Sequence, residues 1–310
     1  IADRTKFTAW ALFVTAWVSI VYFPVAHWVF DFGDKVGEKL IGVGYLAGKG
    51  VLDFAGGTAV HINAGAAGLA LALVLGKRHG WRRDPMRPHS LPLVLLGSGL
   101  LWFGWFGFNA GSALGANGIA GLALINTQVA TGAALIGWLL VEKIRDGHAT
   151  SLGAASGAVA GLVAITPACA FVAPWAAVVL GLIAGIVCAL AVGLKYKFGF
   201  DDSLDVVGVH LVGGIWGCLS IGLFATKGVN SLGGNGLFNG GGLDLLKTQA
   251  FGAFFVLAYS FLVTLIIGFV INKTIGFRVT QEAEVNGIDL VEHRETAYEM
   301  FSSSRGGISA

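Results

Sequence analysis

Long apolar runs alternate with short polar segments along nearly all of the 310 residues. Nearly uncharged runs of about 20 apolar residues are typical of helices that cross a membrane, whose hydrocarbon core is about 30 Å thick. Eight such runs occur, at residues 7–30, 51–75, 91–112, 119–141, 150–168, 172–194, 204–226 and 248–271. The pattern therefore predicts an all-α polytopic membrane protein, with eight transmembrane helices in residues 1–274 and a cytoplasmic tail in residues 275–310.

Composition and charge agree with this prediction and orient the helices. Hydrophobic residues make up 55% of the chain and charged residues only 12%. Fifteen of the 20 Lys and Arg residues lie before the first run, in alternate loops and in the tail, with a cluster at 77–87. By the positive-inside rule these segments are cytoplasmic, which predicts a multi-pass protein of the inner (plasma) membrane. The net charge of +2 is spread over loops, so nucleic acid is not an expected partner.

Two apolar runs share a polar pattern that suggests a buried site. Asp53 precedes His61 by eight residues, and Asp202 precedes His210 by the same spacing. The two runs enter from opposite faces, as in an inverted-topology repeat. Eight helical residues span roughly 12 Å, so both imidazoles should lie near the middle of the membrane. Neutral imidazoles can hydrogen-bond to each other, and such a pair could line a narrow conduit and handle a proton; hydrogen-bonded core histidines are the alternative.

Three acidic residues at helix starts are predicted to cap them. Asp53, Asp202 and Asp205 lie where a carboxylate can accept hydrogen bonds from free backbone N–H groups. Direct binding of a cation is the alternative for each of them. The cysteines, Cys169, Cys188 and Cys218, have no metal-ligand spacing and are read as small buried residues.

An aromatic stripe occupies the end of the third run. Trp105, Phe108 and Ser112 fall on one helical face, at spacings of three and seven residues. Such a stripe can belong to an interfacial aromatic belt. A serine one turn beyond the phenylalanine, among glycines, also fits the lining of a pathway, and the sequence leaves both interpretations open.

Four stretches in order carry a family resemblance: "DFAGGTAVHINAG", "GWFGFNAGS", "GAASGAVAGLVAITPACA" and "DDSLDVVGVHLVGG". They resemble the ammonium transporter (Amt/MEP/Rh) family. The resemblance implies a homotrimer of eleven-helix subunits, each with two inverted halves and its own pore. The eight predicted helices would then be the last eight, with the first three missing from an N-terminally truncated bacterial-type member.

Residue roles follow from the same resemblance. His61 and His210 would be the central pore pair and proton relay, Phe108 a gate, and Asp53 a helix cap that supports the outer ammonium site. Ser112 would belong to that outer site, with Trp105 close to the lining.

The outer-site aromatic would be Phe30, where the family commonly has Trp. A phenyl ring is a weaker cation–π partner than an indole, so weaker recruitment of ammonium is expected.

These assignments predict a transporter and not an enzyme, without cofactor or metal. Ammonium would be recruited and deprotonated outside, and ammonia conducted past the histidines, with the proton crossing separately or not at all. A PII-type signal protein is the expected cytoplasmic partner. An ammonium sensor, an Rh-type gas channel and a metalloenzyme using both histidines are the alternatives. For the last, no third ligand is found at matching depth, and a catalytic zinc usually has three protein ligands.

Overall fold

The computed structural model describes residues 1–36, 39–84 and 86–298, so the end of the predicted tail, residues 299–310, lies outside the described residues. Seven described helices are long and apolar enough to cross a membrane: Phe7–Phe30, Gly57–Leu75, Leu91–Gly111, Gly118–Asp146, Pro174–Phe198, Val207–Phe224 and Asp244–Thr274. The chain is therefore a helical membrane protein, as the hydrophobic runs predict.

Three of these helices contain a wide π-helical turn, in which hydrogen bonds join residues five apart. In the first, η1 (Val18–Tyr22) lies between α1 (Phe7–Trp17) and α2 (Phe23–Phe30). The others begin with the wide turn: η3 (Gly57–Ile62) leads into α3 (Asn63–Leu75), and η4 (Val207–Leu211) leads into α9 (Val212–Phe224). The two predicted pore histidines lie in η3 and η4. Isolated π turns often mark functional positions in helices.

The remaining long helices are regular, and two of them begin with a side-chain cap. They are α4 (Leu91–Gly111), α5 (Gly118–Asp146), α7 (Pro174–Ala191), which is followed by the short α8 (Leu194–Phe198), and α10 (Asp244–Thr274). The side chains of Ser90 and Asn117 accept hydrogen bonds from the first turns of α4 and α5. These contacts satisfy N–H groups that have no partner within the helix.

The run at 150–168 does not form a helix of membrane-spanning length. It contains α6 (Ser151–Ile165), which at 15 residues extends about 22 Å at 1.5 Å per residue. Pro167 has no N–H group to bond to the carbonyl of Val163, and its ring would clash with that carbonyl in a continuing helix, so the helix ends before it. The chain then continues as buried turns to Phe171. The prediction of a helix over 150–168 included these turns because their hydropathy is as high as that of the helix.

The connections outside the membrane helices are short elements. A hairpin pairs β1 (Asp34–Val36) with β2 (Lys39–Ile41), a small departure from an all-α chain. Single helical turns form η2 (Ala47–Lys49) and η5 (Leu237–Asn239), and the described tail contains α11 (Gln281–Asn286) and η6 (Asp289–His293).

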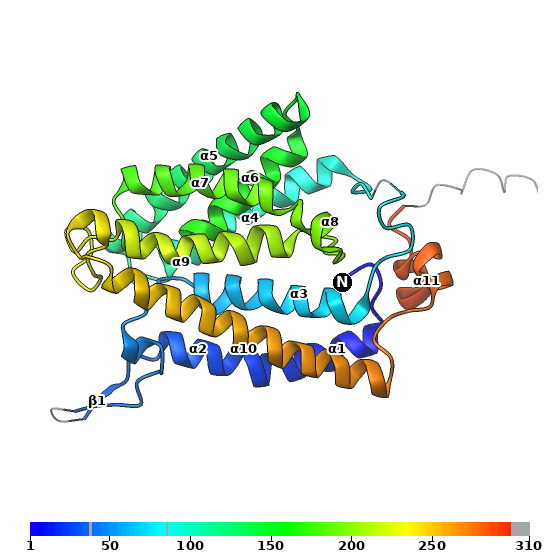
Figure 1. Ribbon diagram of the computed structural model, residues 1–310, viewed down its shortest axis with the longest axis horizontal. Coiled ribbons are helices and arrows are strands. Elements are labelled where there is room, and N and C mark those ends of the chain that lie inside the picture. Colours follow the sequence, from blue (N-terminus) through cyan, green and yellow to red (C-terminus); the bar gives the residue numbers. More distant parts are fainter. Residues whose placement is uncertain (37–38, 85, 299–310) are drawn as a thin grey trace, which may run out of the picture.

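Close helix packing places the two histidine-bearing helices in the centre. In Figure 1, α3 and α9 run side by side with α10, and α4 to α7 cover one side. Small residues allow the close approach: a Cβ atom on Gly157 would lie 2.7 Å from the Cβ of Trp138, and one on Gly161 would lie 2.7 Å from the Cβ of Ala134. The glycine stripe on α6 therefore serves packing against α5.

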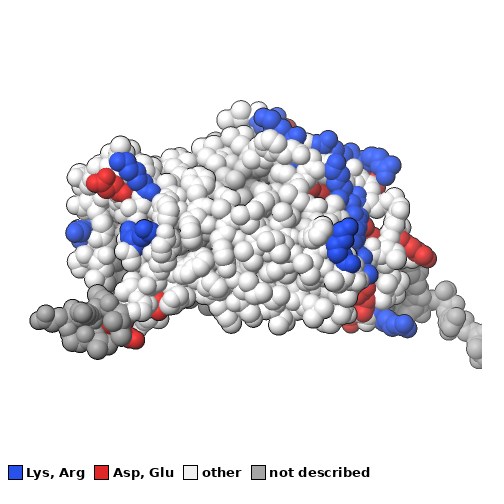
Figure 2. Space-filling view, turned by 60° about the horizontal axis from the view of Figure 1, so that its bottom comes forward, with Lys and Arg blue, Asp and Glu red and all other residues white. Residues whose placement is uncertain are grey.

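Charge is concentrated at the two ends of the molecule, with an uncharged band between them (Figure 2). One end carries most of the Lys and Arg side chains. It comprises residues 1–6, 76–84, 86–90, 195–203 and 275–298, and is called the basic end below. The helix α11 of the described tail lies at this end of the molecule (Figure 1).

Candidate functional site

The structure brings the imidazoles of His61 and His210 into direct contact. Their Nδ1 atoms are 3.3 Å apart and their ring centroids 5.4 Å apart, although 149 residues separate them in the sequence. His61 is 3% exposed, so this polar group lies inside the protein. A hydrogen bond between the rings satisfies two nitrogens that would otherwise be costly to bury.

Glycines allow α3 and α9 to approach closely enough for this contact. A Cβ atom on Gly65 of α3 would lie 2.5 Å from the backbone nitrogen of Leu211, and one on Gly214 of α9 would lie 3.2 Å from the Cβ of His61. These neighbours include backbone and cannot simply rotate away. The two glycines therefore set the separation of the helices, and with it the distance between the imidazoles.

Thr166, in the turn after α6, completes the polar centre. Its Oγ1 is 3.3 Å from His61 Nε2, accepts a hydrogen bond from Trp105 Nε1 at 2.9 Å and donates one to the carbonyl of Leu162 at 2.7 Å. Thr166 is not among the site residues predicted from the sequence. A polar residue inside an apolar run and directly before a proline was the available signal.

An aromatic wall from α4 encloses one side of His61. The Trp105 ring is stacked on the imidazole, with centroids 5.4 Å apart and planes at 20°. The Phe108 ring is 6.2 Å from the imidazole and 5.5 Å from the Trp105 ring. Trp105 is thus buried against His61, while Phe108 is 40% exposed.

The other two predicted recruitment residues lie apart from this wall. Ser112 follows α4, and its hydroxyl donates a hydrogen bond to the carbonyl of Phe108. Phe30, at the end of α2, packs against a core cluster that contains Val29 and residues of α9 and α10. The structure therefore links Ser112 to Phe108 through the backbone, and places Phe30 in a different cluster.

The carboxylate of Asp53 caps η3. It accepts hydrogen bonds from the backbone N–H groups of Gly56, Gly57, Thr58 and Ala59, over 2.7 to 3.1 Å, and is 6% exposed. All four donors belong to the turn that leads to His61. The side chain therefore holds the π turn in place from within the protein.

Comparison with known proteins identifies the family. Residues 1–298 match the model of the Ammonium Transporter Family. The chain belongs to this family. It is 56% identical to the ammonium transporter of Mycobacterium tuberculosis, over 99% of this chain and 65% of that protein, and 48% identical to the ammonium transporter of Bacillus subtilis, over 96% of this chain and 70% of that one. The chain thus spans just under two thirds of the length of the mycobacterial relative.

Solved structures of the family share the fold of this ammonium transporter family member. Candida albicans Mep2 superposes with a TM-score of 0.80 at 35% identity, over 90% of this chain and 61% of that one. A structure described as a sensor Amt protein gives a TM-score of 0.84 at 32% identity, over 94% of this chain and 71% of that one.

At the start of the second histidine-bearing helix, the two aspartates of this family member differ in role. Asp202 accepts a hydrogen bond from the backbone N–H of Val207 at 2.7 Å, as a cap does. The side chain of Asp205 does not cap. Its backbone is left-handed, with φ of 59°, so its carbonyl accepts from Val209 while its carboxylate pairs with Lys195 at 2.6 Å. The prediction that Asp205 caps this helix with its side chain is therefore wrong.

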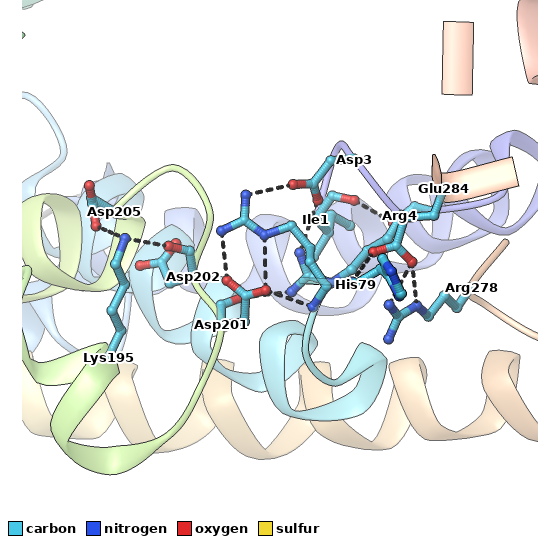
Figure 3. Close-up of polar contacts among 12 residues, drawn as sticks. Ile1, Asp3, Arg4, His79, Lys195, Asp201, Asp202, Asp205, Arg278 and Glu284 are labelled. Carbon is cyan, nitrogen blue, oxygen red and sulfur yellow. Dashed lines mark hydrogen bonds and ion pairs between the residues drawn. The ribbon is translucent and has the colours of Figure 1, made fainter. Parts of the chain in front are cut away.

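A network of ion pairs joins the segments of the basic end (Figure 3). Asp201 accepts from the backbone N–H and the guanidinium of Arg78 at 2.7 to 2.9 Å, and Arg78 also pairs with Asp3. Although burial acts to raise it, the hydrogen bonds and charge of Arg78 hold the pKa of the Asp201 carboxyl below its usual value. The network fixes the residues after α3 to those before α9.

A second contact joins the described tail of the family member to the same loop. Arg278 pairs with Glu284 and donates to the carbonyl of Leu75 at 3.0 Å, and Glu284 accepts from the backbone N–H of His79. The tail is thus attached to the end of α3.

A cavity of about 300 Å³ lies beside His210 on the side of the basic end. It is lined by residues of α4, α6 and the approach to α9, among them Ser98, Ser156 and Asp205. A larger cavity of about 700 Å³ shares Ser156 and Asp205 and is lined further by the loop at the basic end. Burial raises the pKa of the Asp205 carboxyl, against the charge of Lys195. The two cavities thus adjoin at Ser156 and Asp205, between His210 and the loop of the basic end.

Proposed function

We propose that this chain forms the central pathway of an ammonium transporter of the inner (plasma) membrane. The observation that carries the proposal is the direct contact of His61 and His210, in a buried setting, next to an aromatic wall and a cavity. An ionised group in the middle of a membrane is costly, whereas ammonia is neutral and small. The pathway therefore conducts ammonia past the histidine pair and leaves the proton to a separate route along the imidazoles.

In this proposal the polar end of α4 receives ammonium from outside. Trp105, Phe108 and Ser112 lie on this helix, with Phe108 as the gate between the outer site and the histidines. Phe30, which packs in a different cluster, would supply a further aromatic face for the cation at the outer site. Asp53 acts through the η3 turn, because its oxygens are occupied by four backbone N–H groups.

The family and the charge distribution support a proposal for the assembly and the orientation. We infer a homotrimer with eight of its subunit's helices in this chain, α6 being the short one. The basic end faces the cytoplasm, together with the tail and a PII-type signal protein as partner. Lipid covers the uncharged band between the two charged ends.

The test of the proposal is substitution of each pore histidine in the full-length protein, with current recorded on lipid membranes. Replacing His61 or His210 with Ala leaves the partner imidazole unpaired, at a cost of about 1 to 3 kcal/mol, and removes a step of the proton route. We expect ammonium-dependent current to be abolished in both variants. An acidic residue at one of the positions can still exchange a proton, so it should retain transport and admit potassium.

A matched control for this experiment is His148→Ala, because His148 is exposed just after α5 and, among the described residues, its ring hydrogen-bonds to a backbone carbonyl. Its current should equal that of the unaltered protein. Unaltered ammonium current in both pore variants would make the histidine pair structural and the proposed pathway wrong.

Sensing is the second candidate function, since a sensor Amt protein is among the most similar solved structures. A sensor would bind ammonium and change its contacts at the basic end while carrying little current. Ammonium binding without measurable uptake by the full-length protein in vesicles would favour sensing over transport.

A further inference from the structure

We propose that Thr166 is a positioning residue that fixes the tautomers of the histidine pair. In this arrangement His61 carries its proton on Nε2 and His210 carries its proton on Nδ1. The assignment of the protons rests on geometry alone, and its consequence for proton movement rests on the proposed function.

The hydrogen-bonding capacity of the threonine hydroxyl carries the argument. A hydroxyl donates one hydrogen and accepts at two lone pairs, an indole N–H only donates, and a backbone carbonyl only accepts. The Leu162 carbonyl, at 2.7 Å, therefore takes the single hydrogen of Thr166, and the Trp105 indole, at 2.9 Å, occupies one lone pair. One lone pair remains for His61 Nε2 at 3.3 Å. That ring nitrogen must therefore bring the hydrogen.

The end of α6 explains why the hydroxyl is committed to the carbonyl of Leu162. In a continuing helix this carbonyl would accept from the N–H of the residue four positions on, which is Thr166. Here the N–H of Thr166 turns to the carbonyl of Val163, at 3.3 Å. Pro167 has no N–H group, so it cannot donate to the Val163 carbonyl instead of Thr166. The Leu162 carbonyl thus depends on the hydroxyl, because a buried carbonyl without a partner is costly.

The direction of the bond between the rings follows. With its hydrogen on Nε2, neutral His61 has a lone pair on Nδ1. The bond of 3.3 Å between the two Nδ1 atoms then requires His210 to donate. His210 Nε2 is left with the lone pair. His210 lines the cavity that leads to the basic end, whereas His61 does not.

The pair is consequently open to a proton at one end only. A proton arriving from the cavity forms an N–H bond at His210 Nε2. The Nδ1–H bond of His210 then breaks, and its proton forms an N–H bond with the lone pair of His61 Nδ1. His61 becomes the imidazolium and His210 is neutral again. At the other end, His61 offers Thr166 an N–H group and no lone pair, so a proton cannot enter there until the tautomers have reversed.

Nitrogen-15 magnetic resonance of the full-length protein in lipid tests the assignment, because protonated and unprotonated ring nitrogens have distinct shifts. Signals are assigned by replacing histidines singly. We expect Nε2–H at His61 and Nδ1–H at His210, each favoured over the other tautomer by roughly tenfold, the value of one hydrogen bond. Thr166→Val, which keeps the shape and removes the hydroxyl, should bring the tautomers to within about threefold of each other, while Thr166→Ser should restore the preference.

The matched control is Thr131→Val. Thr131 is also buried and its hydroxyl donates to a carbonyl four residues earlier, that of Thr127, at 2.6 Å. Its loss should destabilise the protein in a similar way without changing the histidine signals.

Three results would contradict different parts of this proposal and of the proposed function. A hydrogen on Nδ1 of His61 in the unaltered protein would overturn the proposal without any variant. Unchanged tautomers in Thr166→Val would show that another group sets them. Absence of ammonium transport by the unaltered protein would remove the proposed function while leaving the tautomer measurement valid.

Discussion

At the scale of single residues, the site consists of polar groups with almost every hydrogen-bonding position occupied. The Asp53 carboxylate has four donors, and Thr166 has three partners around one oxygen. These hydrogen bonds are required because an unpaired polar group in the protein interior costs free energy. It also makes each of these residues hard to replace.

Asp53 offers a direct test of capping against cation binding. Asp53→Ala removes the acceptor of four buried N–H groups, so the free energy of unfolding should fall by about 3 kcal/mol or more. Asp53→Asn keeps one acceptor oxygen and should lose less. The measurement is thermal unfolding of the purified protein in detergent, together with the ammonium concentration that gives half-maximal current.

Direct binding of the cation by Asp53 would give another outcome. The half-maximal ammonium concentration would rise in Asp53→Asn, and the unfolding temperature would stay where it is in the unaltered protein. Capping predicts a lower unfolding temperature in both variants.

At the scale of elements, contact between α3 and α9 depends on residues without side chains. Gly65 lies against the backbone of Leu211, and Gly214 lies against His61. Each helix enters this contact through a π turn, which widens the helix at the histidine. The distance between the imidazoles is therefore a property of two helices and not of the histidines themselves.

Gly65→Ala tests this dependence. The added methyl group must push the start of α9 away, because its nearest neighbour is a backbone atom at 2.5 Å. Overpacking costs about 1 to 3 kcal/mol, and a displacement near 1 Å in a site can reduce a rate by about a hundredfold. Because of this displacement, we expect the ammonium-dependent current per folded molecule to fall at least about tenfold.

Gly132→Ala is the control for the intrinsic effect of replacing a helical glycine. A Cβ atom there meets nothing within 4 Å in the chain. Equal currents in the two variants would mean that helix separation does not set the function of the pair.

At the scale of the whole molecule, the basic end holds together segments that are distant in the sequence. Arg78 and Asp201 join the ends of the two central helices, and Arg4 donates to the backbone carbonyl of Asp201 at 2.7 Å. Arg278 and Glu284 attach the described tail to the same loop. The helices of the membrane region thus meet one polar layer at this end.

The ion pairs of this polar layer should make the unfolding temperature of the protein depend on pH. The pKa of Asp201 is lowered in the folded protein, so its contribution is present above the pKa of the unfolded chain, about 3.9. That contribution is lost as the pH falls through the lowered folded value. Asp201→Asn should therefore lower the unfolding temperature at pH 7 and reduce its further decrease on acidification.

The unfolding temperature between pH 7 and pH 3, measured in detergent, decides this point. Asp146→Asn is the control, since Asp146 pairs with Arg145 in solvent, where such pairs contribute little. Identical pH curves for Asp201→Asn and the unaltered protein would show that the buried network does not stabilise this end.

Much of this organisation could be predicted from the sequence, for identifiable reasons. Apolar runs locate the membrane helices because the hydrocarbon core requires about 20 residues. The equal spacing of Asp53 to His61 and of Asp202 to His210 predicts the meeting of the imidazoles, because it is a property of the chain itself.

Other features depend on tertiary contacts or on backbone conformation. The role of Thr166 depends on contacts 61 and 105 residues away. The left-handed backbone of Asp205 turns its carboxylate to Lys195, and hydropathy does not report such a change. The length of α6 was overestimated because apolar turns after a helix have the same composition as the helix.

The long separation of the two histidines has a consequence for biosynthesis. A ribosome adds about 5 to 20 residues per second, so His210 is made between about 7 and 30 s after His61, which precedes it by 149 residues. During this interval Nδ1 of His61 lacks the imidazole with which it pairs in the folded protein. An unpaired polar nitrogen in an apolar setting costs free energy. The contact that removes this cost forms late in translation, after α4 to α7 have been made.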